Sequence, residues 1–141
     1  DGSLMKAFLL AAVLLLFLAG CSSLSSHKNP AVKLGDFRRF HVEKRLSDDR
    51  GIDTLIARDL QRRGFEVTQG FLTMMPDNAQ VIISYDDRWA WDFRTYLIEL
   101  NIAAVDAHRK KLIATGTLRV PGPLSRDPEL VITEILDSFF K

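Results

Sequence analysis

Few side chains of this 141-residue sequence have the types and spacing that catalysis needs. Nucleophilic catalysis requires a serine or cysteine held by a base that a third group orients. The histidines His41 and His108 fall in a predicted strand and a predicted turn, where a lone imidazole is usually packed or solvated. The sequence also lacks a Gly-x-Ser-x-Gly elbow and the glycine-rich strings that hold phosphates. We therefore assign no catalytic residue and expect a protein that is not an enzyme.

An acidic cluster of Asp48, Asp49 and Asp53 invites comparison with a metal site. These carboxylates stand at the predicted start of a helix, where they cap backbone N–H groups and suit the helix dipole without an ion. The single cysteine excludes a cysteine-rich zinc site and an internal disulfide framework. With 19 Lys+Arg against 18 Asp+Glu, the formal charge of +1 creates no field that would hold a nucleic acid. We expect no metal, no cofactor other than a covalent lipid, and no nucleic-acid partner.

The most unusual stretch runs from Asp86 to Arg94 and holds both tryptophans of the chain. In an extended chain its three alternate aromatic side chains lie on one side. They either continue a sheet and cover its core, or they tip a hairpin that docks on a bilayer or on another protein. The candidate contact residues are Trp89, Trp91, Phe93, Arg88 and Arg94.

A second candidate is a basic turn made of His108, Arg109, Lys110 and Lys111. Clustered cations can contact the phosphates of lipid headgroups. Such a turn is more commonly only solvated, so it is the weaker of the two candidates.

The N-terminal segment has the pattern of a targeting signal. Residues 1–4 precede Met5 and are treated as an upstream remnant, and 5–20 combine Lys6 with a run of 14 small or apolar residues, too short to span a bilayer as a helix. The run ends Leu-Ala-Gly before Cys21, which resembles the bacterial lipobox. The alternative is a short buried or membrane-spanning helix. The resemblance implies that Cys21 becomes the first mature residue, acylated on its sulfur and its amine and stably anchored.

Residues 21–32 are expected to form the lipidated cysteine and a polar, flexible tether, with His27 and Lys28 solvated. In the Gram-negative sorting rule an aspartate after the cysteine favours the inner membrane. Ser22 therefore indicates the periplasmic face of the outer membrane.

Hydrophobic periodicity predicts one α+β domain over residues 33–141. Alternating residues from Tyr96 to Ala104, and from Leu112 to Val120, should each share a buried face. The order β-α-β-β-β-β-α indicates a mostly antiparallel sheet of about four to five strands, with two helices on one face. The expected strands are 36–44, 65–68, 81–85, 95–105 and 112–120, and the expected helices are 49–63 and 128–140.

The order of these motifs resembles a family of small bacterial envelope lipoproteins known only as a domain of unknown function. The resemblance implies a periplasmic lipoprotein of this fold and supplies no catalytic residue. Members often have a glycine in the hairpin turn where this chain has Lys110. The motifs are the lipobox, Leu60-x-x-x-Gly64-Phe65, Ala79–Tyr85, Asp106-Ala107, Lys111–Ala114 with Gly116, and the closing helix.

Two functions are compatible with these features. The favoured one is a membrane-anchored periplasmic lipoprotein that binds or scaffolds another component of the cell envelope. The alternative is a carrier of a small apolar ligand or lipid, held between sheet and helices by aromatics such as Trp89, Trp91 and Phe140. An envelope hydrolase is the least favoured class, and the sequence does not indicate an oligomeric state.

Overall fold

The computed structural model describes residues 2–18, 23–120 and 126–141. Its regular elements are α1 (Gly2–Leu18), β1 (Ser23–Lys28), η1 (Leu34–Asp36), β2 (Arg39–Glu43), α2 (Ile52–Arg62), β3 (Glu66–Gly70), η2 (Leu72–Met74), β4 (Val81–Asp92), β5 (Arg94–Asp106), β6 (Leu112–Arg119) and α3 (Pro128–Phe139).

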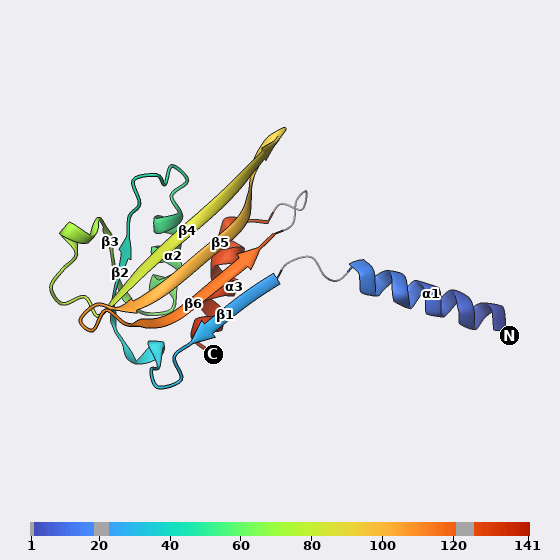
Figure 1. Ribbon diagram of the computed structural model, residues 1–141, viewed down its shortest axis with the longest axis horizontal. Helices are drawn as coiled ribbons and strands as arrows, with labels where there is room; N and C mark the ends of the chain where they lie inside the picture. The colour runs from blue at the N-terminus through green and yellow to red at the C-terminus, as the bar shows by residue number, and fades with distance from the viewer. Residues whose placement is uncertain (1, 19–22, 121–125) are drawn as a thin grey trace.

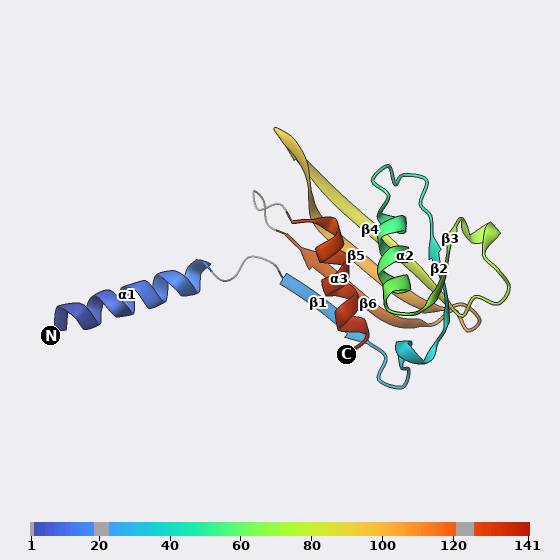
Figure 2. The same cartoon turned by 180° about the vertical axis from the view of Figure 1, so that it is seen from behind.

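A mixed six-stranded sheet with the order β1-β6-β5-β4-β2-β3 forms one layer. Strand β2 is parallel to its neighbours β3 and β4, and the other pairs are antiparallel. Helices α2 and α3 cover one face of this sheet (Figures 1 and 2). The α+β class is confirmed, with six strands instead of the expected four to five.

The additional strand is β1, in a segment predicted to be a flexible tether. Residues 23–28 pair in register with β6, from Ser23 opposite Arg119 to Lys28 opposite Ala114. The tether prediction is therefore wrong for these residues. It failed because a strand at a sheet edge needs backbone partners more than apolar side chains, and Leu24 is the single apolar residue of β1.

Helix α2 begins later than its acidic cluster suggested. Gly51, the residue before Ile52, has a left-handed backbone conformation with a φ of 70°. As a glycine it supplies no side-chain cap to the helix. Asp48 still serves the helix start, since its carboxylate accepts the backbone N–H groups of Arg50 at 2.8 Å and Asp53 at 3.3 Å. The expected capping role thus belongs to Asp48 alone within that cluster.

Helix α3 has the start that its sequence predicts. The Asp127 carboxylate accepts the N–H of Glu129 at 2.9 Å, and Pro128 occupies the first turn. The apolar face of α3 packs closely on β6. A Cβ added to Gly116 would lie only 2.9 Å from Ile135 and 3.1 Å from Phe139. Phe139 is buried as a result, and the expected apolar end of the helix packs on this chain's own sheet.

Two register shifts alter the expected alternation of the long strands. Between Arg88 and Trp89 the β4–β5 pairing skips Ile98, so Leu97 instead of Tyr96 joins the core. A second shift near the β5–β6 turn leaves Ile113 buried and Leu112 exposed. Period-two reasoning cannot anticipate such bulges, which reverse the facing of every residue beyond them.

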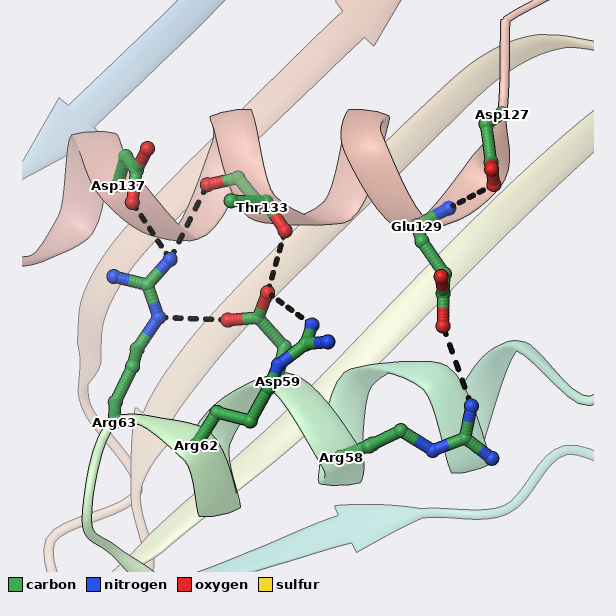
Figure 3. A network of polar contacts seen from close by, with 8 residues as sticks. All are labelled: Arg58, Asp59, Arg62, Arg63, Asp127, Glu129, Thr133 and Asp137. Atoms are coloured by element: carbon green, nitrogen blue, oxygen red, sulfur yellow. Dashed lines mark hydrogen bonds and ion pairs between the residues drawn. The ribbon is translucent and has the colours of Figure 1, made fainter.

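A polar network joins α2 to α3 (Figure 3). Asp59 is only 3% exposed, yet its carboxylate accepts hydrogen bonds from Arg63 Nε at 2.7 Å and Thr133 Oγ1 at 2.6 Å. Arg62 lies 3.3 Å from the same carboxylate, and Arg63 also binds Asp137 at 2.7 Å. The network links the two helices, and it pairs the charged side chains of Asp59, Arg63 and Asp137 that lie between them.

Helix α1 lies apart from the sheet and the other helices, and the side chains of residues 2–15 are exposed (Figure 1). Within the part of the chain that the structure describes, no helix has both the length and the apolar character needed to cross a membrane. The predicted lipidation site, Cys21, lies outside the described residues.

Candidate functional site

The β4–β5 hairpin projects beyond the rest of the sheet (Figure 1). Its ladder runs from Val81 opposite Asp106 to Asp92 opposite Arg94. Strand β4 therefore continues seven residues past the predicted end at Tyr85, through the whole aromatic stretch. The pairing satisfies the backbone groups that face across the hairpin.

Hydrogen bonds and an ion pair brace the inner part of this hairpin against the start of α2. The Tyr85 hydroxyl donates to the Asp48 carboxylate at 2.6 Å, and Arg45 donates to the Tyr85 carbonyl at 2.9 Å and to Asp86 at 2.6 Å. Burial works to raise the pKa of Asp48, but the bonds from Tyr85 and from backbone N–H groups outweigh it and lower that pKa. Burial and the bond to Asp48 both raise the pKa of Tyr85.

Trp89 packs against the folded core. It is partly buried and packs against core residues, and its indole N–H donates to the Asp87 carboxylate at 2.6 Å. The Arg50 guanidinium lies 4.7 Å from the centre of its ring, a contact that sequence spacing gave no sign of. For Trp89, the interpretation that the aromatics cover the core is correct.

Trp91 and Phe93 are different, because these residues are 78% and 97% exposed. Phe93 forms the turn with a φ of 62°, a conformation that a large residue adopts only at an energetic cost. Glycine or asparagine would form this turn more easily. We call Trp91 and Phe93 the aromatic tip.

One arginine lies next to the tip, and two others lie farther back along the hairpin beside a glutamate. Arg88 and Arg119 both approach Glu99, at 3.6 and 3.5 Å, and Arg94 is exposed beside Phe93. Arg119 was not singled out from the sequence, since only the pairing of β6 with β5 brings it here. The structure thus places Trp91, Phe93 and Arg94 at the end of the hairpin, whereas Arg88 lies farther back, opposite Glu99.

The basic turn lies at the opposite end of the same strands. His108, Arg109, Lys110 and Lys111 are all exposed between β5 and β6. The Asp106 carboxylate accepts the backbone N–H groups of His108 and Arg109, each at 2.9 Å, and the bond from Arg109 is the main cause of its lowered pKa. Lys110 has a φ of 57°, a conformation that glycine adopts more easily than lysine does.

The histidines do not form a catalytic group with one another. His41 is 1% exposed, with Nε2 at 3.0 Å from the Gly70 carbonyl and Nδ1 at 2.8 Å from the Thr68 hydroxyl. Because a carbonyl only accepts, Nε2 donates to Gly70, and both ring nitrogens have a hydrogen-bond partner. His27 lies exposed on β1 and His108 in the basic turn. Among the described residues, no three His, Cys, Asp or Glu side chains gather as metal ligands would.

The aromatic pocket expected for a carrier is not formed as predicted. Trp89 and Trp91 lie on the hairpin, whereas Phe140 stacks on Phe65 with ring centres 5.2 Å apart. Side chains that are almost fully buried fill the layer between the sheet and the helices. Phe140 instead lines an open hollow of about 500 Å³ between residues 28–36 and the end of α3, with Lys28, Lys33 and Lys141.

Comparisons with known proteins support the fold and little more. The sequence matches no protein-family model and no curated protein. Among solved structures, two PelC dodecamers from Paraburkholderia phytofirmans are similar, one with TM-score 0.59 and 15% identity over 84% of this chain and 99% of that one. The other has TM-score 0.54 and 14% identity over 84% and 94% of the two chains. A PDZ domain protein from Parabacteroides distasonis aligns with TM-score 0.52 and 9% identity over 92% of this chain and 38% of that one.

Proposed function

We propose that this chain is a lipid-anchored protein of the cell envelope, on the periplasmic face of the outer membrane, which is not an enzyme and which binds another envelope component. The observation that carries the proposal is the aromatic tip. Two large aromatic side chains stand almost fully in solvent at the end of a well-paired hairpin, one of them in a costly backbone conformation. Exposed aromatics of this kind act as anchors in interfaces.

The N-terminal sequence supports the anchored location. The apolar residues of α1 are exposed and extend from the folded domain, as expected of a targeting helix that is removed. Cys21 follows this segment and would carry the lipid, and Ser22 favours the outer membrane.

One form of scaffolding is self-association. The PelC structures with a similar fold are dodecamers, and this sheet ends in two edge strands, β1 and β3, that can pair with another chain. A second copy of this chain is therefore one candidate for the envelope component.

Site-specific crosslinking tests this function in the intact bacterium. A photo-crosslinking residue is placed at Phe93, and in a matched control at Met74, which is 72% exposed on η2 outside the hairpin. We expect a discrete adduct from position 93 that position 74 does not give. An adduct of twice the chain's mass identifies a second copy. Equal labelling from both positions, or none from 93, contradicts binding by the tip.

The hollow beside Phe140 keeps a ligand carrier as the second candidate. Its volume of about 500 Å³ lies within the usual range for small-molecule sites. Native mass spectrometry of the protein from its own membrane distinguishes the two functions. A bound small molecule that is lost on replacing Phe140 by Ser would favour the carrier.

A further inference from the structure

We propose that the aromatic tip enters the same bilayer that holds the lipid on Cys21, so that the domain stands on the membrane at two points with its basic turn directed away. This inference rests on the proposed lipid anchor. It commits the tip to a lipid surface, where the proposed function leaves the bound component open.

The first step is the position of β1. Because Ser23 pairs with Arg119, Arg119 with Glu99, and Glu99 with Arg88, these four residues form one row across the sheet. Cys21 precedes Ser23 by two residues, which limits their separation to about 7 Å in any conformation. The anchor is therefore held close to one defined end of the sheet, not on a long free tether.

The second step is the direction of the hairpin. From the row of Glu99, the β5 side of the hairpin continues for five residues to Arg94, a length of about 17 Å. It extends past the same end of the sheet at which β1 begins (Figure 1). The tip thus lies about 10 Å beyond the farthest position that Cys21 can reach. That excess is close to the depth, about 5–10 Å, to which interfacial segments enter a bilayer.

The third step is the chemistry of the tip. Tryptophan prefers the interface between water and hydrocarbon, and phenylalanine is apolar enough to pass below it. The ladder continues to Asp92 and Arg94, so the backbone groups that face across the hairpin are already paired, and only the outward-facing groups at its end have to be desolvated. Arg94, exposed next to Phe93, is placed to contact lipid phosphates.

The proposed orientation places the basic turn on the side of the domain away from the membrane. Residues 108–111 join β5 to β6 at the end of the strands remote from Ser23 and from the tip. A membrane contacted by the tip cannot also contact this turn. The headgroup contact predicted for the basic turn is therefore not made with the anchoring bilayer, and the turn faces the aqueous space.

Depth-dependent fluorescence quenching tests the proposal on the full-length acylated protein. The protein is reconstituted in vesicles of phosphatidylethanolamine and phosphatidylglycerol that contain brominated phosphatidylcholine. We expect lipid bromine to quench a large part of the tryptophan emission, and Trp91→Phe to remove at least three-quarters of that quenching. Trp89 remains in both proteins as the core reference.

Two controls separate the outcomes. Flotation of the vesicles shows whether the acylated protein is bound to them. If the protein floats but lipid bromine does not quench Trp91, this inference alone is overturned. If the protein does not float, the proposed function is overturned. A fluorophore on Lys110→Cys reports the far end and is expected to remain accessible to aqueous quenchers and untouched by lipid bromine. Quenching of that fluorophore by lipid would overturn the upright orientation.

Affinity gives an independent readout without the anchor. For the Cys21→Ser protein, replacing both Trp91 and Phe93 by Ser is expected to weaken binding to the same vesicles about tenfold or more. Replacing Met74 by Ser, an exposed apolar residue outside the hairpin, should change it less than twofold. Equal losses from the two replacements would contradict a specific role of the tip.

Discussion

Asp59 is the residue on which the contact between α2 and α3 depends most. Its buried carboxylate binds Arg62, Arg63 and Thr133 at the same time. Asp59→Asn leaves the arginines without the charge that they pair with, and we expect a loss of about 2 kcal/mol in the free energy of unfolding, measured by urea denaturation. Asp49→Asn, at an exposed site, is the control. A loss below about 0.5 kcal/mol would show that the network is dispensable.

Tyr85 and Asp48 make the stability sensitive to acid. The pKa of Asp48 is lower in the folded protein than its ordinary value of 3.8, so its contribution is complete above that value and is lost as the pH falls through the folded-state pKa. Tyr85→Phe removes the largest of the hydrogen-bond contributions that lower this pKa, and we expect it to cost about 1 kcal/mol at pH 7 and less at pH 2. Unfolding curves at both pH values measure the difference.

The other tyrosine supplies the matched control. Tyr96→Phe removes a hydroxyl of the same kind from the facing strand of the hairpin. If both variants lose the same stability at pH 7 and pH 2, the Tyr85 bond does not control the ionisation of Asp48.

The same substitution is expected to affect stability strongly at one tryptophan and hardly at all at the other. Trp89→Ser removes partly buried surface, a hydrogen bond and the contact with Arg50, and we expect it to lower the free energy of unfolding by about 2 kcal/mol. Trp91→Ser removes only an exposed side chain and should change it by less than about 0.5 kcal/mol. Thermal denaturation measures the stability of both variants. A large loss of stability in Trp91→Ser would show that Trp91 contributes to the core.

Among the elements, the contact between β6 and α3 leaves the least space for change. At Gly116 a methyl group would meet Ile135 and Phe139, both buried. Gly116→Ala should therefore destabilise the protein by about 1–3 kcal/mol, as overpacked cores do. Gly35→Ala, with open space around it, is the control, and urea denaturation compares the two. Equal stabilities would mean that α3 shifts freely on the sheet.

Elements with an apolar period could be predicted from the sequence, and elements made by long-range backbone pairing could not. The spacing of apolar residues predicts helices α2 and α3 and the inner strands, and these residues are buried in the core. Strand β1 has almost no such residues, and its existence depends on the free edge of β6. The phase change at Ile98 likewise results from the pairing itself.

The candidate site was found by composition and only partly understood. An unusual concentration of aromatics marks the hairpin, but periodicity does not reveal that the structure partly buries Trp89 and exposes Trp91. The division depends on where the sheet ends and the hairpin projects alone. Arg50 and Arg119 approach the site from distant segments, so no local signal marks them.

At the scale of the whole molecule, the two ends of the sheet differ in character. One end carries the aromatic tip and the start of β1, and the other carries the basic turn and the hollow lined by Lys28, Lys33 and Lys141. A lipid at Cys21 would direct the end with the aromatic tip toward the membrane and the end with the basic turn away from it. The proposed location and the two-point attachment therefore depend on whether the anchor exists.

Mass spectrometry of the mature protein from its own membrane tests that claim most directly. The wild type should begin at Cys21 and carry added acyl mass, and Cys21→Ser should carry none. A wild-type protein that retains Met5, or that has a free thiol at Cys21, would contradict the anchored location and the two-point attachment together.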